Sequence, residues 1–167
     1  MSITADRPRL LTAISFVLGL ATIAGAWGSQ LIGGLVPCEL CLEQRLPYYL
    51  GLPVLALILI FWNRLPRTVW YVAMAIAIAT FVWSTWLAGY HSGVEWHWWP
   101  GPTACTGTGV TVNFNDLNNI NATRVIPCDA VQFRFLGLSL AGYNALISIA
   151  IVAMLLAATV LRGRKAA

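Results

Sequence analysis

Residues Pro37–Arg45 read Pro-Cys-Glu-Leu-Cys-Leu-Glu-Gln-Arg and separate two long apolar stretches of the chain. This segment holds a Cys-x-x-Cys pair, two glutamates and an arginine, whereas the stretches on either side hold almost no charge. The segment therefore marks a boundary between two hydrophobic runs. It also places a redox-capable dithiol at the edge of one of them.

The composition of the whole chain indicates a membrane protein. Of its 167 residues, 59% are hydrophobic and 10% are charged, whereas soluble domains carry roughly 25% charged residues. The net charge of +4 comes from basic residues at the edges of apolar runs, not from a basic stripe, so we expect no nucleic-acid partner. The length fits one domain, residues 1–167.

Four apolar runs predict four helices, at about residues 10–36, 44–62, 68–90 and 135–161. A helix of roughly 17–25 residues crosses a ~30 Å hydrocarbon core, and no run alternates like a barrel strand. The predicted fold is an all-α membrane protein, a four-transmembrane-helix bundle. A long extracytoplasmic loop, about 91–134, joins the third and fourth helices. The first run resembles a signal peptide, but its length favours a retained helix.

Basic residues predict the orientation of this bundle, because Lys and Arg gather on the cytoplasmic side of membrane proteins. Seven of them fall at the two termini and in the connection between the second and third helices: Arg7, Arg9, Arg64, Arg67, Arg162, Arg164 and Lys165. We therefore expect both termini in the cytoplasm. All four cysteines then lie on the outer, oxidising face of a bacterial inner membrane.

The residues around the Cys-x-x-Cys pair favour a reactive thiol. Cys38 and Cys41 lie near the predicted start of a helix, where unpaired backbone N–H groups favour a thiolate. Arg45 follows Cys41 by one helical turn, so we predict that its guanidinium lowers the pKa of this thiol and donates to a carbonyl ligand; an interfacial arginine is the alternative. His91 is either a proton-handling or ligand-contacting residue, or an ordinary interfacial histidine.

The four cysteines, Cys38, Cys41, Cys105 and Cys128, allow three interpretations. Two structural disulfides are the first, although a Cys-x-x-Cys bond closes a loop too short to add much stability. A zinc site is the second, but only one pair has ligand spacing, and an oxidising compartment disfavours free thiolates. The third is thiol–disulfide exchange, in which one pair reaches a protein and the other reaches an oxidant in the membrane. Spacing, sidedness and Arg45 favour exchange, and we expect no metal ion.

Several motifs, in this order and spacing, resemble the disulfide bond formation protein B (DsbB) family. They are Pro37–Cys41 with Arg45, Tyr90-His91, Pro100–Cys105, and Cys128-Asp129 followed by Phe135–Ser139. The resemblance extends over all four predicted helices and the loop. It implies a quinone-dependent protein thiol oxidase that generates disulfides in the bacterial cell inner membrane.

The resemblance also implies a role for each cysteine. The expected disulfides are Cys38–Cys41 and Cys105–Cys128. Cys105 would be attacked by a periplasmic, DsbA-like thioredoxin-fold protein, and electrons would reach the first pair through a transient Cys38–Cys128 bond. Cys41 would then donate to ubiquinone or menaquinone from the membrane quinone pool.

In the same resemblance, Arg45 holds the quinone and His91 lies near it. Two alternatives stay open at this point. One is a membrane reductase similar to the vitamin K epoxide reductase group. The other is a non-enzymatic membrane protein whose cysteines form structural disulfides or hold a metal.

Overall fold

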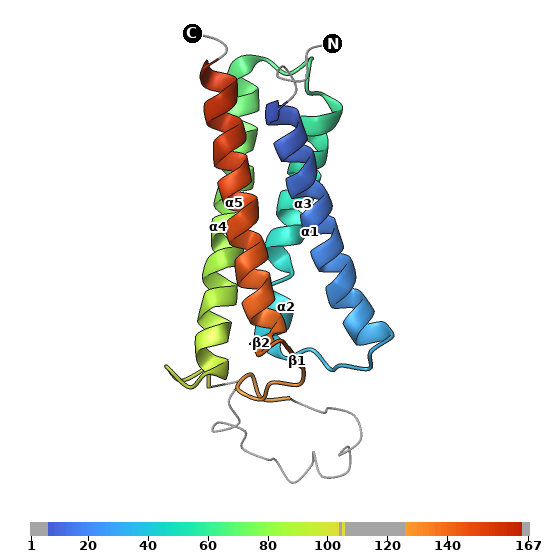
Figure 1. Ribbon diagram of the computed structural model, residues 1–167, viewed down its shortest axis with the longest axis vertical. Helices are drawn as coiled ribbons and strands as arrows, with labels where there is room; N and C mark the ends of the chain where they lie inside the picture. Colours follow the sequence, from blue (N-terminus) through green and yellow to red (C-terminus); the bar gives the residue numbers. More distant parts are fainter. Residues whose placement is uncertain (1–6, 104, 106–125, 165–167) are drawn as a thin grey trace.

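The computed structural model describes residues 7–103, 105 and 126–164. Within these residues, four long helices run along the length of the molecule (Figure 1): α1 (Arg7–Leu31), α3 (Leu46–Ile60), α4 (Arg67–Glu95) and α5 (Leu140–Arg164). A short helix precedes α3, and a two-stranded hairpin precedes α5: α2 (Glu39–Glu43), β1 (Arg134–Phe135) and β2 (Leu138–Ser139).

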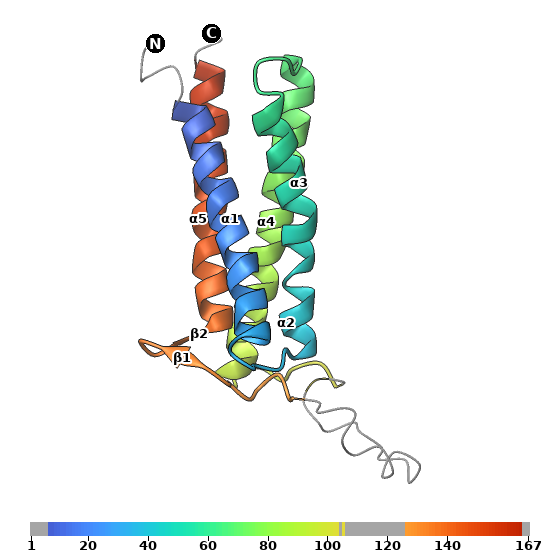
Figure 2. The ribbon, with the colours of Figure 1, turned by 90° about the vertical axis from the view of Figure 1, so that its right-hand side faces the viewer.

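The long helices form a closed four-helix bundle. Helix α1 packs against α3 and α5, and α4 packs against the same two neighbours from the other side. Figure 2 shows α1 beside α5, and α4 beside α3. Small residues bring the helices close together, since a Cβ on Gly19 would lie 2.9 Å from Leu52 and one on Gly51 would lie 2.9 Å from Phe81. Phe81 also packs edge-on against Tyr48, so these residues join three helices in the core.

The outer surface of the bundle is apolar. Large hydrophobic side chains stand exposed on every long helix, among them Val17, Leu57, Val72, Trp86 and Ile149. Helices α1, α4 and α5 are long and apolar enough to cross a membrane. Helix α3 is equally apolar but has 15 residues, or about 22 Å at the helical rise per residue, and is the shortest of the four.

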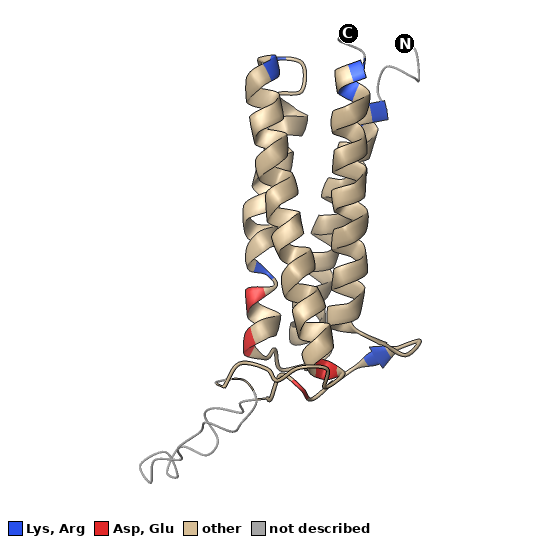
Figure 3. Ribbon diagram, turned by 90° about the vertical axis from the view of Figure 1, so that its left-hand side faces the viewer, with Lys and Arg blue, Asp and Glu red and all other residues tan. Residues whose placement is uncertain are grey.

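Charge divides the bundle into two ends. Among the described residues, most arginines lie at the end that carries the N-terminus of α1, the C-terminus of α5 and the α3–α4 connection, whereas the acidic residues lie at the opposite end, beside α2 and the hairpin (Figure 3). The Cys-x-x-Cys segment is at this acidic end. The structure therefore separates the predicted cytoplasmic charges from the cysteines along the long axis of the molecule.

Three helix boundaries differ from those predicted. Helix α1 ends at Leu31 and not near residue 36 as predicted. Gly34, which follows its end, has a left-handed φ of 65°, a conformation that stops a helix. The predicted helix 44–62 begins at Leu46, because Arg45 is its N-cap and Pro47 occupies its first turn. Helix α4 continues to Glu95, so His91 and the following turn are helical and not part of the loop.

The predicted start of the last helix, at residue 135, is wrong. Strands β1 and β2 form a hairpin over residues 134–139, and α5 begins only at Leu140. Leu136 and Gly137 both have positive φ angles, 47° and 82°, as a two-residue hairpin turn requires. Ser139 then accepts a hydrogen bond from the backbone N–H of Gly142 and caps α5. Most of the predicted loop interior, residues 106–125, lies outside the described residues.

Candidate functional site

The Cys-x-x-Cys segment forms helix α2 and the residue before it. Cys38 is the N-cap, and its Sγ accepts a hydrogen bond of 3.2 Å from the backbone N–H of Cys41. The dithiol thus lies at a helix N-terminus, as the sequence predicts. Cys38 is buried and Cys41 is half-buried, and both are free thiols. The disulfide that the resemblance implies between them is not formed in this structure and stays a prediction for the oxidised protein.

The two thiols of this pair differ in acidity. Their mutual hydrogen bond lowers the pKa of Cys41, because Cys38 supplies the shared proton; burial opposes this effect, and backbone hydrogen bonding supports it. The same hydrogen bond, followed by burial, raises the pKa of Cys38. Arg45 lowers the pKa of Cys41 too, but it is the weakest of the causes. The direction predicted for Arg45 therefore agrees with the structure, but Cys38 is the main cause of the lowered pKa.

His91 lies at the centre of the site. It is 3% exposed, so it is not an ordinary interfacial histidine. Its Nε2 is 3.7 Å from Cys38 Sγ and 3.2 Å from the carbonyl oxygen of Cys128, while its Nδ1 is 2.6 Å from Gln44 Nε2. Because a carbonyl only accepts, Nε2 carries the proton and Nδ1 accepts from the Gln44 amide. The imidazole is thereby fixed in one tautomer, with its N–H facing the sulfurs.

A chain of hydrogen bonds supports Gln44 from the bundle interior. The amide oxygen of Gln44 accepts from Asn144 on α5, and Asn144 in turn accepts from the hydroxyl of Tyr48. Tyr48 also contacts Ser148, which contacts Ser84 on α4. This network joins α3, α4 and α5 beneath the dithiol. It sets the orientation of each amide and, through Gln44, that of His91.

The second pair of cysteines packs against the first. Cys105 and Cys128 form a disulfide bond with their Cα atoms 5.3 Å apart. Both are buried in one cluster with Cys38, Leu40 and Val94. The loop disulfide is therefore not held apart from the membrane dithiol, and Cys128 lies on the Cys38 side of the site.

A four-cysteine zinc site does not form in this state, because Cys105 and Cys128 are bonded to each other. The donor atoms of Cys38, Cys41 and His91 do lie within 4.8 Å of one another. Structural zinc sites use four protein ligands, and among the described residues only these three donors come together. Three protein donors are also the set of a catalytic zinc site, so the absence of a metal ion stays a prediction.

Arg45 points away from the cysteines toward the outer end of α1. Its guanidinium donates to Gln30 Oε1 at 2.9 Å and to the Ala26 carbonyl at 3.4 Å, and it lies over the Trp27 ring at 4.9 Å. Gln30, and not Glu43, is thus its side-chain partner. The residue is 7% exposed, and its Nε has no partner.

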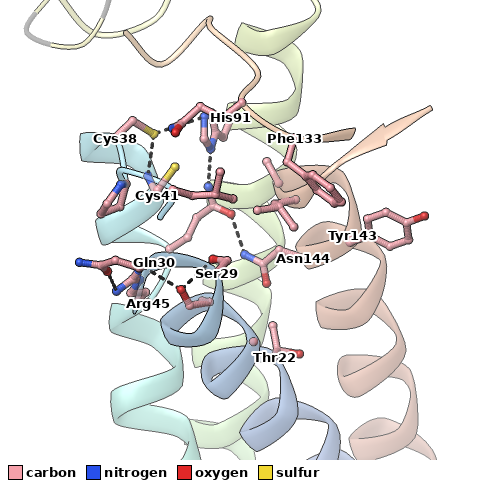
Figure 4. A pocket seen from close by; sticks show the side chains of 18 of the residues that line it. Thr22, Ser29, Gln30, Cys38, Cys41, Arg45, His91, Phe133, Tyr143 and Asn144 are labelled. Atoms are coloured by element: carbon pink, nitrogen blue, oxygen red, sulfur yellow. Dashed lines mark hydrogen bonds between the residues drawn. The ribbon is translucent and has the colours of Figure 1, made fainter. Parts of the chain in front are cut away.

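A cavity of about 310 Å³ joins these groups. Cys41, Gln44, Arg45 and His91 line it together with residues of α1 and α5, and Figure 4 shows how Cys41, Arg45 and His91 lie around it. Its volume and mixed lining are typical of small-molecule sites. The unpartnered Nε of Arg45 is a buried donor that lacks an acceptor, and a quinone carbonyl is such an acceptor. The cavity therefore fits a quinone ring.

Three further site residues are absent from the sequence prediction: Gln44, Glu95 and Asn144. Two of them carry a signal in the chain. Gln44 follows Cys41 by three residues, and Glu95 follows His91 by four, so each shares a helical face with a predicted site residue. Asn144 carries no such signal, because only the tertiary fold brings α5 beside Gln44, the C-cap of α2.

The geometry can be compared with known proteins at this point. The family model described as "Disulfide bond formation protein DsbB" matches residues 8–158, which include α3, α4, most of α1 and α5, and every cysteine. The chain belongs to the DsbB family. No curated protein matches the chain.

Membership of the DsbB family, together with three helices that can cross a membrane, makes this chain a membrane protein of disulfide bond formation. The activity that follows is a disulfide oxidoreductase activity in general terms. It accounts for two cysteine pairs in one buried cluster, which a structural staple does not require. The family match also favours DsbB over the vitamin K epoxide reductase-like alternative.

Proposed function

We propose that this DsbB-family protein is a quinone-dependent protein thiol oxidase that reoxidises a periplasmic, DsbA-like thioredoxin-fold protein. One observation carries the proposal. The free dithiol Cys38/Cys41 lies between a second cysteine pair and a cavity that contains an unpartnered arginine nitrogen. This order gives electrons an entry at one pair and an exit at the other.

In the proposed relay, the Cys38/Cys41 pair starts each turnover as a disulfide. A thiolate of the partner attacks Cys105, and Cys128 leaves as a thiolate, which attacks Cys38, breaks the Cys38–Cys41 bond and releases Cys41 as a thiolate. The partner's second thiol then displaces Cys105, and Cys105 attacks Cys128 in the transient Cys38–Cys128 bond. These steps oxidise the partner, restore the Cys105–Cys128 disulfide and leave the Cys38/Cys41 pair reduced. The packing of Cys38 against Cys128 in one buried cluster supports this transfer, because exchange requires direct contact of the sulfurs. Cys105 is itself 2% exposed, so the residues that bury it must move before the partner can reach its sulfur.

Cys41 is the proposed donor to quinone. Its lowered pKa favours the thiolate, which is the nucleophilic form, and it lines the cavity beside Arg45 and His91. A bound quinone supplies the two-electron oxidant that thiol exchange alone lacks. Arg45 would hold one carbonyl by charge-assisted hydrogen bonding, and the N–H of His91 would remain on the sulfur side. Either ubiquinone or menaquinone satisfies this chemistry.

The same proposal sets the protein in a bacterial inner membrane with all four long helices crossing it. Both termini would lie in the cytoplasm, and the cysteines in the periplasm. The separation of basic and acidic residues between the two ends supports this orientation. A reporter enzyme that works only in the cytoplasm should be active when fused to the C-terminus. Activity of a periplasm-specific reporter at that position would overturn the orientation.

Oxidation of a reduced thioredoxin-fold dithiol protein by the purified chain tests the function. Turnover is expected only with added quinone, and it should be lost in Cys41→Ser. A protein with only structural disulfides would show no turnover under either condition. Normal turnover in Cys41→Ser would remove Cys41 from the relay.

A further inference from the structure

Glu95 is a buried carboxylate at the site that the relay leaves without a role. It is the last residue of α4, it is 8% exposed, and it lines the same cavity as Cys41 and Arg45. Its Oε1 lies 3.9 Å from His91 Nε2. Among the described residues, no lysine or arginine forms an ion pair with it. An ionisable side chain that is buried in a membrane protein without an ion-pair partner indicates a functional site.

Ser139 fixes one oxygen of this carboxylate. The serine hydroxyl donates to Glu95 Oε2 while its oxygen accepts from the Gly142 N–H at the start of α5. The serine thus holds Glu95 in place as part of the helix cap. The other carboxylate oxygen is left facing His91. The hydrogen bond to Ser139 is enough to hold Glu95 in place. It does not explain why the second carboxylate oxygen, Oε1, lies beside the imidazole of His91.

The redox chemistry of the site provides one, on the basis of the function proposed above. Formation of the Cys38–Cys41 disulfide removes two electrons and two protons from the thiols, and reduction of a quinone consumes two of each. The electrons pass from sulfur to quinone directly. The protons need groups that accept them at the thiols and release them at the quinone oxygens. These groups must lie between the dithiol and the cavity.

We propose that Glu95 and His91 are this proton-transfer pair, with Glu95 as the carboxylate that takes a thiol proton and delivers it to the reduced quinone. Glu95 returns to its starting state after each turnover, so the balance of atoms and electrons is that of dithiol and quinone alone. The ionisable groups around Glu95 are His91 on its own helix, Cys41 on α2 and Arg134 on β1.

The different neighbours of the two ring nitrogens of His91 suggest a double variant that tests the position of the carboxylate. Glu95 faces its Nε2, whereas Gln44 contacts its Nδ1 at 2.6 Å. Glu95 and Gln44 differ by one charged group and are similar in size. The double substitution Glu95→Gln with Gln44→Glu therefore keeps the side-chain volumes and moves the carboxylate to the other ring nitrogen. The carboxylate at Nδ1 would draw the imidazole proton away from Nε2, so the double variant should stay as slow as Glu95→Gln if the position of the carboxylate matters.

The test compares the wild type, Glu95→Gln, Glu95→Asp and the double variant, with Glu39→Gln as the control because Glu39 is an exposed acid on α2. Glu95→Gln keeps an acceptor for Ser139. Prereduced protein is mixed with a soluble ubiquinone analogue, and quinone reduction is followed as a function of pH. We expect a loss of about 100-fold in Glu95→Gln, the low end for general acid–base catalysis. One ionisation should also vanish from its pH profile. Glu95→Asp should recover part of the rate, whereas recovery in the double variant would show that the position of the carboxylate does not matter and would overturn the role of Glu95.

A second readout needs no quinone. The negative charge of Glu95 opposes the thiolate of Cys41, so iodoacetamide should label Cys41 at lower pH in Glu95→Gln than in the wild type. Loss of a purely structural contact would not produce this shift together with a changed pH profile.

The outcomes separate the two proposals. A Glu95→Gln protein with the rate and pH profile of the wild type would overturn the role of Glu95 and leave the oxidase function intact. A wild type that reduces no quinone would overturn the oxidase function, and the role of Glu95 with it.

Discussion

Gln44 Nε2 lies 2.6 Å from His91 Nδ1, and the same amide accepts a hydrogen bond from Asn144. Gln44 thus connects the redox histidine to the polar network in the bundle core. All three side chains are held within the helical bundle, so the position of His91 depends on groups from α3, α4 and α5 together. The stability of the bundle and the geometry of the dithiol site are linked through this one glutamine.

Replacing Gln44 by leucine should destabilise the protein. The change leaves His91 Nδ1 and the Asn144 amide without their partners inside the bundle, and each buried unpaired group costs about 1–3 kcal/mol. Thermal unfolding in detergent micelles measures the loss. Gln132→Leu is the control, because Gln132 also bonds twice, to both backbone groups of Val36, but is exposed. Equal losses in both variants would show that burial of the network adds nothing.

We expect iodoacetamide to label Cys41 readily and to leave Cys38 unlabelled. Thiolates react with iodoacetamide and thiols do not. The lowered pKa of Cys41 keeps its thiolate present at pH values where an ordinary cysteine is protonated, and labelling falls only when the pH drops through that lowered pKa. The raised pKa of Cys38 leaves it protonated and unlabelled over the same range. Mass spectrometry of the reduced protein resolves the two sites.

The variant Cys38→Ala checks the cause of this acidity. It removes the donor whose hydrogen bond lowers the pKa of Cys41 most, so labelling of Cys41 should move to higher pH. An unchanged profile would instead assign the acidity to Arg45 or to the backbone. Preferential labelling of Cys38 in the wild type would reverse the assignment of the two thiols.

Arg45→Met should weaken quinone binding more than thiol exchange. The guanidinium is the charged donor in the cavity, and its loss should raise KM for a soluble quinone about tenfold, equivalent to about 1.4 kcal/mol. Reduction of the Cys105–Cys128 bond by a thioredoxin-fold partner without quinone should be unaffected. Arg64→Met is the matched control, because Arg64 is exposed at the opposite end of the bundle. A similar KM in both variants would argue against a quinone contact at Arg45.

Gly93→Ala should loosen the end of α4. A Cβ at Gly93 would collide with the ring of Trp99, whose Nε1 donates to the Tyr90 carbonyl at 3.0 Å and whose ring stacks on Tyr90. Overpacking of this kind costs about 1–3 kcal/mol, measured by thermal unfolding. Gly89→Ala on the same helix is the control, since nothing lies within 4 Å of its Cβ position. It should be neutral or slightly stabilising, and equal destabilisation in both variants would exclude the Trp99 contact as the cause.

The sequence predicts much of this architecture because apolar runs, and the prolines and glycines that begin or end helices, are local features. The four helices follow from the hydrophobic runs, although α3 begins two residues later than predicted, with Pro47 in its first turn. The hairpin before α5 escapes prediction, since Leu136 adopts a left-handed φ that its residue type does not suggest. The five-residue helix α2 is too short to leave a periodic pattern.

The reactive residues of the candidate site can be predicted from the sequence, but the residues that orient them by hydrogen bonding cannot. The cysteines, Arg45 and His91 are recognisable by type and spacing, and the structure brings the cysteines and His91 into contact. The direction of Arg45, toward Gln30 and not toward Cys41, depends on how α1 packs against the start of α3. The contact of Asn144 with Gln44 joins residues 100 positions apart, and no local pattern encodes such a pair.

The central claim is that Cys38 and Cys41 donate electrons to quinone. Its most direct test is anaerobic mixing of prereduced Cys105→Ser/Cys128→Ser protein with a ubiquinone analogue, which isolates the membrane dithiol. Quinone absorbance and mass spectrometry should show the loss of one quinone and the formation of one Cys38–Cys41 disulfide for each protein molecule. Unchanged quinone with both thiols still reduced would contradict the account.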